Sequence, residues 1–220
     1  MTTWMAAYCS AMLAAFPGRV RYMGLQGSRG RGEAGPSSDI DAVLILDEWT
    51  AEDLETYRAA AAELPERDKL CGFVSGAAEL AAWDRGELFQ FRHDTTDFYG
   101  RLSDLLPPEK DSDARRALHT GACGIYHLCC HNGLHGRCLE AAESACKGAV
   151  FVLRAKAYLE TGVYYRRHQE LGDVLTGADL AVFRAAQAVR QGRHDRDLDD
   201  LTALLLGWSG ALIRRWNEKD

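Results

Sequence analysis

The sequence, which has 220 residues, contains no long hydrophobic run. Its longest apolar runs, such as Ala42–Leu46 and Gly148–Leu153, fall far short of the roughly 20 residues that a membrane-spanning helix needs. The chain begins Met1-Thr2-Thr3-Trp4, with no basic flank before its first apolar stretch, which argues against a secretory signal. We therefore expect a cytoplasmic protein that makes no contact with a membrane.

The sequence also has no excess of basic residues. It carries 26 Lys and Arg against 32 Asp and Glu, a formal net charge of −6. A broad nucleic-acid-binding surface needs clustered Lys and Arg, so a long nucleic acid is not expected as a partner. A local basic pocket for a phosphorylated ligand remains compatible with this charge.

The cysteines do not form the regular pattern of a secreted disulfide framework. There are seven, an odd number, with irregular spacing and with Cys129 and Cys130 adjacent. This predicts reduced thiols that are mostly buried, with Cys129 and Cys130 in the core rather than in catalysis.

The composition indicates a folded chain, because 47% of the residues are apolar and 26% are charged. The first half mixes helical and strand patterns. These patterns predict a helix over residues 2–16, strands over Val20–Leu25 and Ile40–Leu46, a Thr50-capped helix to about Leu64, a strand over Cys71–Val74, a helix over Ala77–Trp83 and an extended region over Leu88–Tyr99.

After Pro107-Pro108 the helical period dominates. Helices are predicted over Ser112–Cys130, Leu139–Thr161, Ala178–Gln191 and Leu198–Trp216. We therefore predict an α+β fold, with a boundary near Leu106–Lys110. An α/β domain with a small mixed sheet (residues 1–106) precedes a helical bundle (residues 107–220).

The segment richest in chemical information joins the first two predicted strands. It reads Gly24-Leu25-Gln26-Gly27-Ser28-Arg29-Gly30-Arg31-Gly32 and continues as Ser38-Asp39-Ile40-Asp41 into an apolar strand. Small residues at a bend leave backbone N–H groups open to a phosphate. Residues two apart on a strand share a face, and two adjacent carboxylates suit a hard divalent cation such as Mg²⁺. Either half alone is commonly just a loop or a solvated strand end, but the ordered pair indicates metal-dependent phosphoryl or nucleotidyl transfer.

This segment resembles the signature of the nucleotidyltransferase superfamily related to DNA polymerase beta, in which Gly-Ser precedes Asp-x-Asp on the next strand. It is most similar to the minimal nucleotidyltransferases and to those that modify aminoglycosides and lincosamides. The resemblance implies a nucleotidyltransferase domain over residues 1–106 and a helical domain that closes over nucleotide and acceptor. It also implies metal ligation by Asp39 and Asp41, and nucleotide contacts from Gly27, Ser28, Arg31 and Ser38, with Arg29 as the alternative arginine.

Members of this superfamily use a third carboxylate, from a later strand, as a metal ligand and often as the base for the attacking hydroxyl. Asp94 and Asp97 both qualify here, and on a regular strand they would point to opposite faces. We favour Asp94, because Asp-Thr-x-x-x-Tyr-Gly looks like the corresponding segment of related proteins. The predicted catalytic and metal-binding set is thus Asp39, Asp41 and Asp94, with one or two Mg²⁺ and with ATP or another NTP as co-substrate.

The helical half offers two further candidates. Lys147 stands in a small, apolar stretch, and the resemblance implies a phosphate ligand there, although a surface lysine would look the same. His119, Cys123, His127, His131 and His135 recur every four residues. That spacing suits a zinc pair, but each four-residue step over-rotates by about 40°, and packed or pocket-lining histidines are the alternative. Tyr164–His168 would line an acceptor pocket or end a helix.

The predicted activity is transfer of a nucleoside monophosphate, AMP in the first instance, to a hydroxyl of a small antibiotic-like molecule. The alternatives are an antitoxin-like enzyme that AMPylates a protein and a non-catalytic nucleotide-binding regulator. The expected partners are the NTP and a small-molecule or protein acceptor, and the protein is expected to be a monomer or a homodimer.

Overall fold

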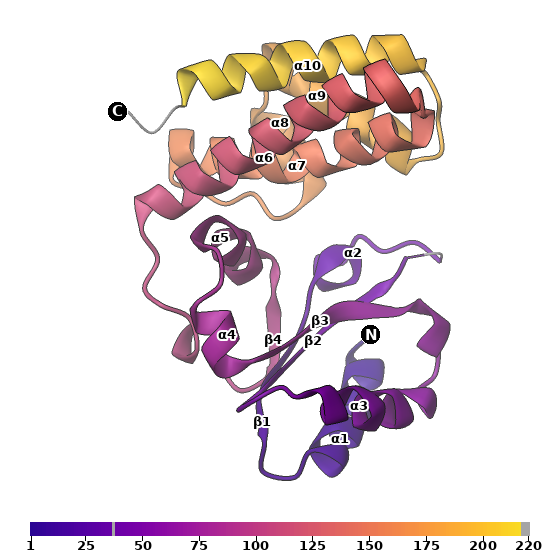
Figure 1. The fold of residues 1–220 in the computed structure, drawn as a ribbon, viewed down its shortest axis with the longest axis vertical. Helices are drawn as coiled ribbons and strands as arrows, with labels where there is room; N and C mark the ends of the chain where they lie inside the picture. Colours follow the sequence, from indigo (N-terminus) through magenta and orange to yellow (C-terminus); the bar gives the residue numbers. More distant parts are fainter. Residues whose placement is uncertain (37, 217–220) are drawn as a thin grey trace. The chain divides into compact units, whose positions relative to one another are not determined.

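The computed structural model describes residues 1–36 and 38–216. Contacts divide the chain into two compact units: residues 1–84 with 91–108, and residues 85–90 with those from 109 onward. The first unit holds α1 (Thr2–Ala15), β1 (Val20–Leu25), α2 (Gly27–Gly30), β2 (Ile40–Leu46), α3 (Ala51–Ala62), β3 (Leu70–Gly76), α4 (Ala77–Ala81), the end of α5 (Arg85–Asp94) and β4 (Thr96–Tyr99). The predicted α+β fold class is confirmed (Figure 1).

The first unit is built around one small mixed sheet with the strand order β3-β2-β1-β4. β1 runs antiparallel to both β2 and β4, whereas β3 is parallel to β2. The strands predicted over Val20–Leu25 and Ile40–Leu46 are confirmed with the same bounds.

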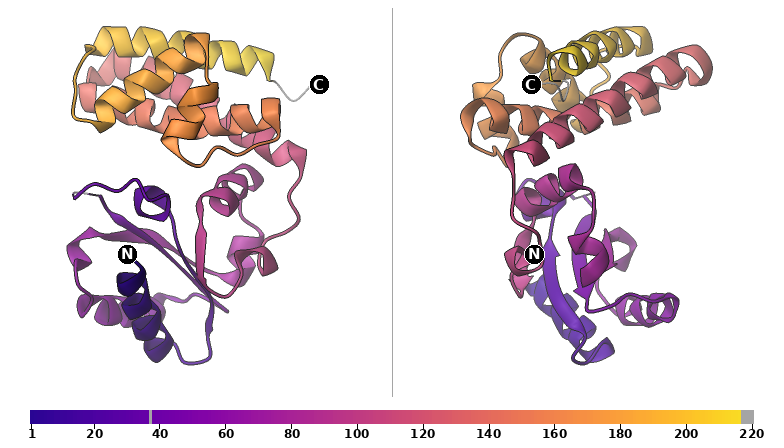
Figure 2. Two further views of the ribbon diagram at one scale, coloured as in Figure 1. Left: turned by 180° about the vertical axis from the view of Figure 1, so that it is seen from behind. Right: turned by 60° about the vertical axis from the view of Figure 1, so that its left-hand side comes forward.

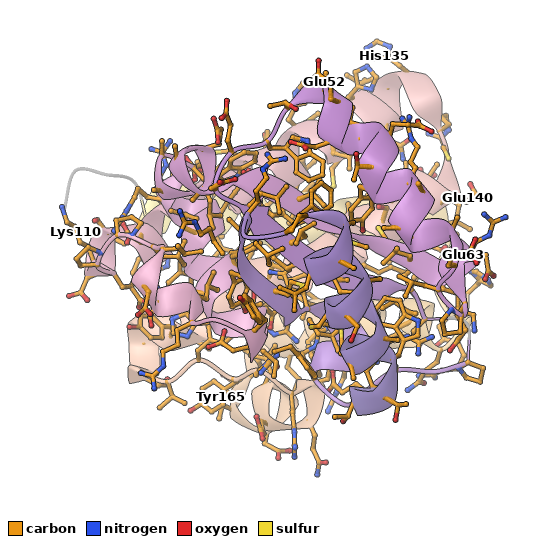
Figure 3. The ribbon with its side chains drawn as sticks, turned by 90° about the horizontal axis from the view of Figure 1, so that it is seen from below. Glu52, Glu63, Lys110, His135, Glu140 and Tyr165 are labelled. Carbon is orange, nitrogen blue, oxygen red and sulfur yellow. The ribbon has the colours of Figure 1, made fainter. Side chains whose placement is uncertain are left out.

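Helices α1 and α3 pack together on one face of this sheet (Figures 1 and 2). Figure 3 shows them side by side, with Glu52 and Glu63 at opposite ends of α3. Ile40, Ala42 and Leu44 of β2 point into the core that these helices cover. The intervening residues of β2 are on the other face, as the alternation of a strand requires.

One predicted element is wrong. The sequence predicts an extended region over Leu88–Tyr99, but the structure has helix α5 to Asp94 and only then the short strand β4. The reason is that α5 carries aromatic residues for two different cores. Phe89 packs on Tyr158 of the second unit, whereas Phe91 packs on Phe73 of the first. The resulting alternation of Phe, Gln and Phe imitates a strand.

The second unit is a helical bundle. It contains α6 (Asp111–His131), a π-helical turn (Asn132–Gly136), α7 (Leu139–Thr161), α8 (His168–Val174), α9 (Gly177–Arg190) and α10 (Leu198–Arg215). The four long helices are confirmed, and the π-helical turn and α8 were not predicted. Helix α6 packs against α7 and α10, and α7 packs against α9. None of the described helices combines the length and hydrophobicity of a membrane span.

All seven cysteines are free thiols, but the prediction that most are buried is wrong. Cys129 and Cys146 are buried in the bundle, Cys71 is exposed on β3 and the other four are partly exposed. Burial raises the pKa of the Cys129 and Cys146 thiols to about 11, which suits core residues rather than nucleophiles.

Candidate active site

Three segments that are far apart in the sequence meet at one end of the sheet. Because β1 lies between β2 and β4 and is antiparallel to both, the end of β1 adjoins the start of each neighbour. Leu25 pairs with Ala42 on one side and with Thr96 on the other. The residues that follow β1 are therefore placed beside Asp41 and beside the segment that precedes β4.

Asp41 is the half-buried centre of this end. It projects to the face opposite the one that α1 and α3 cover, because its neighbours Ile40 and Ala42 point into that core. Burial raises the pKa of the Asp41 carboxyl, and the nearby charges of Asp39 and Asp94 raise it further, against the opposing effect of two arginines. The structure thus brings the three predicted carboxylates into one electrostatic environment.

Gly27 is fixed by direct contact with this carboxylate. Its backbone has φ +65°, a left-handed conformation that favours glycine. A Cβ atom there would overlap Oδ2 of Asp41. The first residue of the Gly-Ser bend and the second aspartate therefore touch, and no larger side chain fits between them.

The bend continues as α2, a single helical turn that the sequence patterns did not predict. The amides of Gly30 and Arg31 close the turn by donating to the carbonyls of Gln26 and Gly27. The amides of the first turn of a helix have no partner within it. The Ser28 hydroxyl forms no hydrogen bond to the described part of the chain. These donors sit beside Asp41 and would suit phosphate oxygens.

The two arginines of the bend have different tasks. Arg29 donates to the carbonyls of Ser38 and Asp39 and so braces the chain as it enters β2. Arg31 is directed at the carboxylates: its Nη1 lies 3.1 Å from Oδ2 of Asp94, and its Nε lies 3.1 Å from Oε2 of Glu33. The predicted phosphate contact of Arg31 stays a prediction.

Ser38 lies in the loop that Arg29 braces. Its hydroxyl accepts a hydrogen bond from the amide of Gly35, and its own amide donates to the Gly35 carbonyl. Its predicted nucleotide contact also stays a prediction, and in this arrangement the hydroxyl serves the loop.

Asp94 and Asp97 do not lie on one strand, so the prediction that they point to opposite faces of a strand is wrong. Asp94 is the last residue of α5 and is buried, and its charge acts on Asp41. Asp97 lies on β4, is exposed and accepts a hydrogen bond of 2.7 Å from the hydroxyl of Tyr22. Asp94 is therefore the one of the two whose charge acts on Asp41, although its role as third ligand and base stays a prediction.

One residue of this end was not found from the sequence. Gln26 connects all three segments: its amide donates to the carbonyl of Asp41, and its side chain donates to the hydroxyl of Thr95 at 2.7 Å. Gln26 and Thr95 are 69 positions apart, so no local pattern could have indicated this pair.

Lys147 and the histidines belong to the second unit. Lys147 is exposed on α7, and its phosphate contact stays a prediction. His131 and His135 lie with ring centroids 5.2 Å apart, and His127 and His131 lie 6.1 Å apart. Within residues 1–36 and 38–216, no three His, Cys, Asp or Glu side chains are already grouped to hold a metal ion.

The donor set at the end of the sheet nevertheless fits a hard divalent cation. Carboxylate oxygens are the ligands that Mg²⁺ prefers, and the pKa of Asp41 is raised first by burial and then by the charges of Asp39 and Asp94. Asp39 is exposed and Asp41 half-buried, so both remain open to an ion, whereas Asp94 is bonded to Arg31.

The sheet topology and the bend agree with the fold that the resemblance implied. Residues 12–116 match the family model described as "Nucleotidyltransferase domain". The chain thus contains a nucleotidyltransferase domain, and the predictions of this superfamily and of a transferase enzyme are confirmed.

A solved structure with the same fold is that of spectinomycin adenyltransferase AAD(9) from Enterococcus faecialis with ATP and spectinomycin. The match has a TM-score of 0.56 at 13% sequence identity and covers 96% of this chain and 98% of that one. A comparison with curated proteins gave no match.

Proposed function

We propose that this enzyme transfers AMP from ATP to a hydroxyl of a small, polyhydroxylated, antibiotic-like molecule, with Mg²⁺ as its cofactor. The observation that carries the proposal is the meeting of Asp39, Asp41 and Asp94 beside the Gly27-Ser28 bend. The structurally similar adenyltransferase, whose structure contains ATP and spectinomycin, supports the choice of nucleotide and of acceptor class.

Each residue at this end has a role that follows from its position. Asp39 and Asp41 would hold a divalent cation, which when bound neutralises charge on the triphosphate. The Ser28 hydroxyl and the first amides of α2 donate to phosphate oxygens. Asp94, beside Asp41, accepts the proton of the acceptor hydroxyl, so that the oxygen can attack the α-phosphorus as pyrophosphate leaves.

We assign to the helical unit the roles of helping to bind the nucleotide and the acceptor and of closing over them. Lys147 is its proposed phosphate ligand, and its exposed position on α7 leaves the ammonium group accessible to an anion. Steady-state kinetics of transfer test the role of Lys147. Lys147→Ala should raise the KM for ATP and leave the KM for the acceptor unchanged.

The experiment is a transfer assay with ATP labelled at the α-phosphate, Mg²⁺ and a panel of acceptors that includes spectinomycin. We expect pyrophosphate release and a labelled acceptor, with loss of both in Asp41→Asn. Asp97→Asn is the matched control, since it removes an exposed aspartate from the same unit. Tight ATP binding without pyrophosphate release would contradict the proposal and indicate a nucleotide sensor, whereas label on a protein would indicate AMPylation of that protein.

A further inference from the structure

Arg31 is an unusual arginine, because its side chain is only 9% exposed. It lies between two carboxylates that are themselves largely covered, Asp94 with 7% and Glu33 with 17% of the side chain exposed. Buried charges are costly unless they are paired, and a pair that loses one member leaves the other uncompensated. Arg31 therefore supplies positive charge that offsets part of the cost of burying Asp94.

The same carboxylate belongs to the cluster that would hold a divalent cation. A cation bound by Asp39, Asp41 and Asp94 would stand beside the guanidinium of Arg31, and two like charges at that distance repel. The two oxygens of Asp94 could contact both cations, but each cation would weaken the binding of the other through this repulsion.

We propose that Arg31 is the resident counter-ion of Asp94 and competes with the divalent cation for it. The inference rests on the proposed function only in taking Asp94 as part of the cation site. With a divalent cation bound, Asp94 would share its charge with that cation, and Nη1 of Arg31 would be freed for another partner. Arg31 stays tethered through Nε to Glu33, so its freed nitrogen remains at the bend, where phosphate oxygens would arrive. Arg31 is thus a positioning residue in the ion-free protein.

The test measures thermal unfolding of the full chain without nucleotide or acceptor, in EDTA and in Mg²⁺, at matched ionic strength. In EDTA, Arg31→Gln leaves Asp94 buried without this partner, and the Tm should fall by roughly 5–10 °C. Mg²⁺ should restore at least half of that loss, because the ion replaces the missing positive charge. The apparent affinity for Mg²⁺ should rise about tenfold over the wild type, since the competing guanidinium is gone.

Arg19→Gln is the matched control. Arg19 also bonds a buried aspartate of the first unit, Asp53, whose side chain is 7% exposed. Its loss should lower the Tm in EDTA in the same way, but Mg²⁺ should not restore it. Equal Mg²⁺ effects in the two variants would overturn the proposal, as would an Arg31→Gln protein that Mg²⁺ does not stabilise.

If Arg31→Gln does not fold in EDTA, Arg31→Lys keeps the charge but lacks the planar fork. Its Mg²⁺ affinity should then lie between those of the wild type and of Arg31→Gln refolded in Mg²⁺, and an affinity equal to that of the wild type would contradict competition. Because no substrate is present, the result is independent of the transfer assay. If the wild type transfers no nucleotide but Mg²⁺ stabilises Arg31→Gln, the counter-ion proposal stands and the proposed function fails. If the wild type is active but Mg²⁺ does not stabilise Arg31→Gln, the counter-ion proposal fails.

Discussion

The two ends of the β1–β2 pair carry the same kinds of side chain in opposite electrostatic states. At one end Arg19 precedes β1, and its guanidinium contacts Asp47 at 3.2 Å and Asp53 at 2.6 Å. The bonds from Arg19 lower the pKa of the Asp53 carboxyl to about 2. At the other end, burial and neighbouring carboxylates raise the pKa of Asp41.

The difference separates structural from functional charge. Asp53 also accepts from the amide and hydroxyl of Thr50 and so caps α3, which leaves it no capacity for a ligand. Burial raises the pKa of Asp41, and Asp39 and Asp94 add like charge beside it. A bound cation would relieve this state, which commonly marks a functional site. The fold therefore tolerates unfavourable electrostatics at one end of its sheet and removes them at the other.

The largest expected effect comes from Asp41→Asn, which should lower the turnover number about 1000-fold by removing a charge that organises the triphosphate. The raised pKa means that the folded state disfavours the ionised carboxyl. At neutral pH this variant should therefore unfold at a temperature no lower than that of the wild type. Steady-state kinetics measure the turnover number, and calorimetry measures the unfolding temperature. Asp53→Asn should do the reverse, costing about 2 kcal/mol of stability while turnover is kept. Similar losses of turnover and of stability in Asp41→Asn and Asp53→Asn would contradict this difference between the two ends of the strand pair.

Asp94→Asn should lower turnover about 100-fold, since the proposed base is lost. Asp97→Asn should change turnover less than about threefold, because it removes only the hydrogen bond from Tyr22. Steady-state kinetics of the two variants measure both turnover numbers. A larger loss in Asp97→Asn would reassign the third carboxylate.

Gly27→Ala should reduce turnover about tenfold to 100-fold, because the added methyl group must displace the Asp41 carboxylate. Gly32→Ala is its control. Gly32 has φ +73° but open space around its Cα, so that substitution carries only the conformational cost of about 1 kcal/mol. The ratio of the two turnover numbers measures the contact alone, and a ratio near one would mean that Gly27 matters only for backbone conformation.

The smallest effect is in the pH dependence of stability. The pKa of Asp53 is depressed from an ordinary 3.8 to about 2. Its stabilisation is therefore complete above about pH 4 and is lost as the pH falls toward 2. Asp41 acts with the opposite sign, since stability declines as the pH rises from 3.8 through its raised pKa. Calorimetric Tm values between pH 2 and 7 should show a flattened acid limb in Asp53→Asn, and an unchanged limb would contradict the assignment.

Much of this site was predictable from local patterns, and what was missed depends on pairing between distant segments. The bounds of β2 followed from an almost unbroken apolar run, and the contact of Gly27 with Asp41 joins segments that are neighbours in sequence. The helical state of Asp94 was missed because α5 serves two cores. The Arg31–Asp94 bond joins positions 63 apart, and nothing in either local sequence indicates it.

The length of β1 has a consequence for how the two charged ends influence each other. Six residues at about 3.3 Å each separate Arg19 from the bend by roughly 20 Å. Across that span, single charges interact by less than about 1 kcal/mol even at an effective dielectric constant of 20. The length of β1 therefore keeps the two charged ends electrostatically almost independent. Substitutions at its opposite ends should change the free energy of unfolding additively.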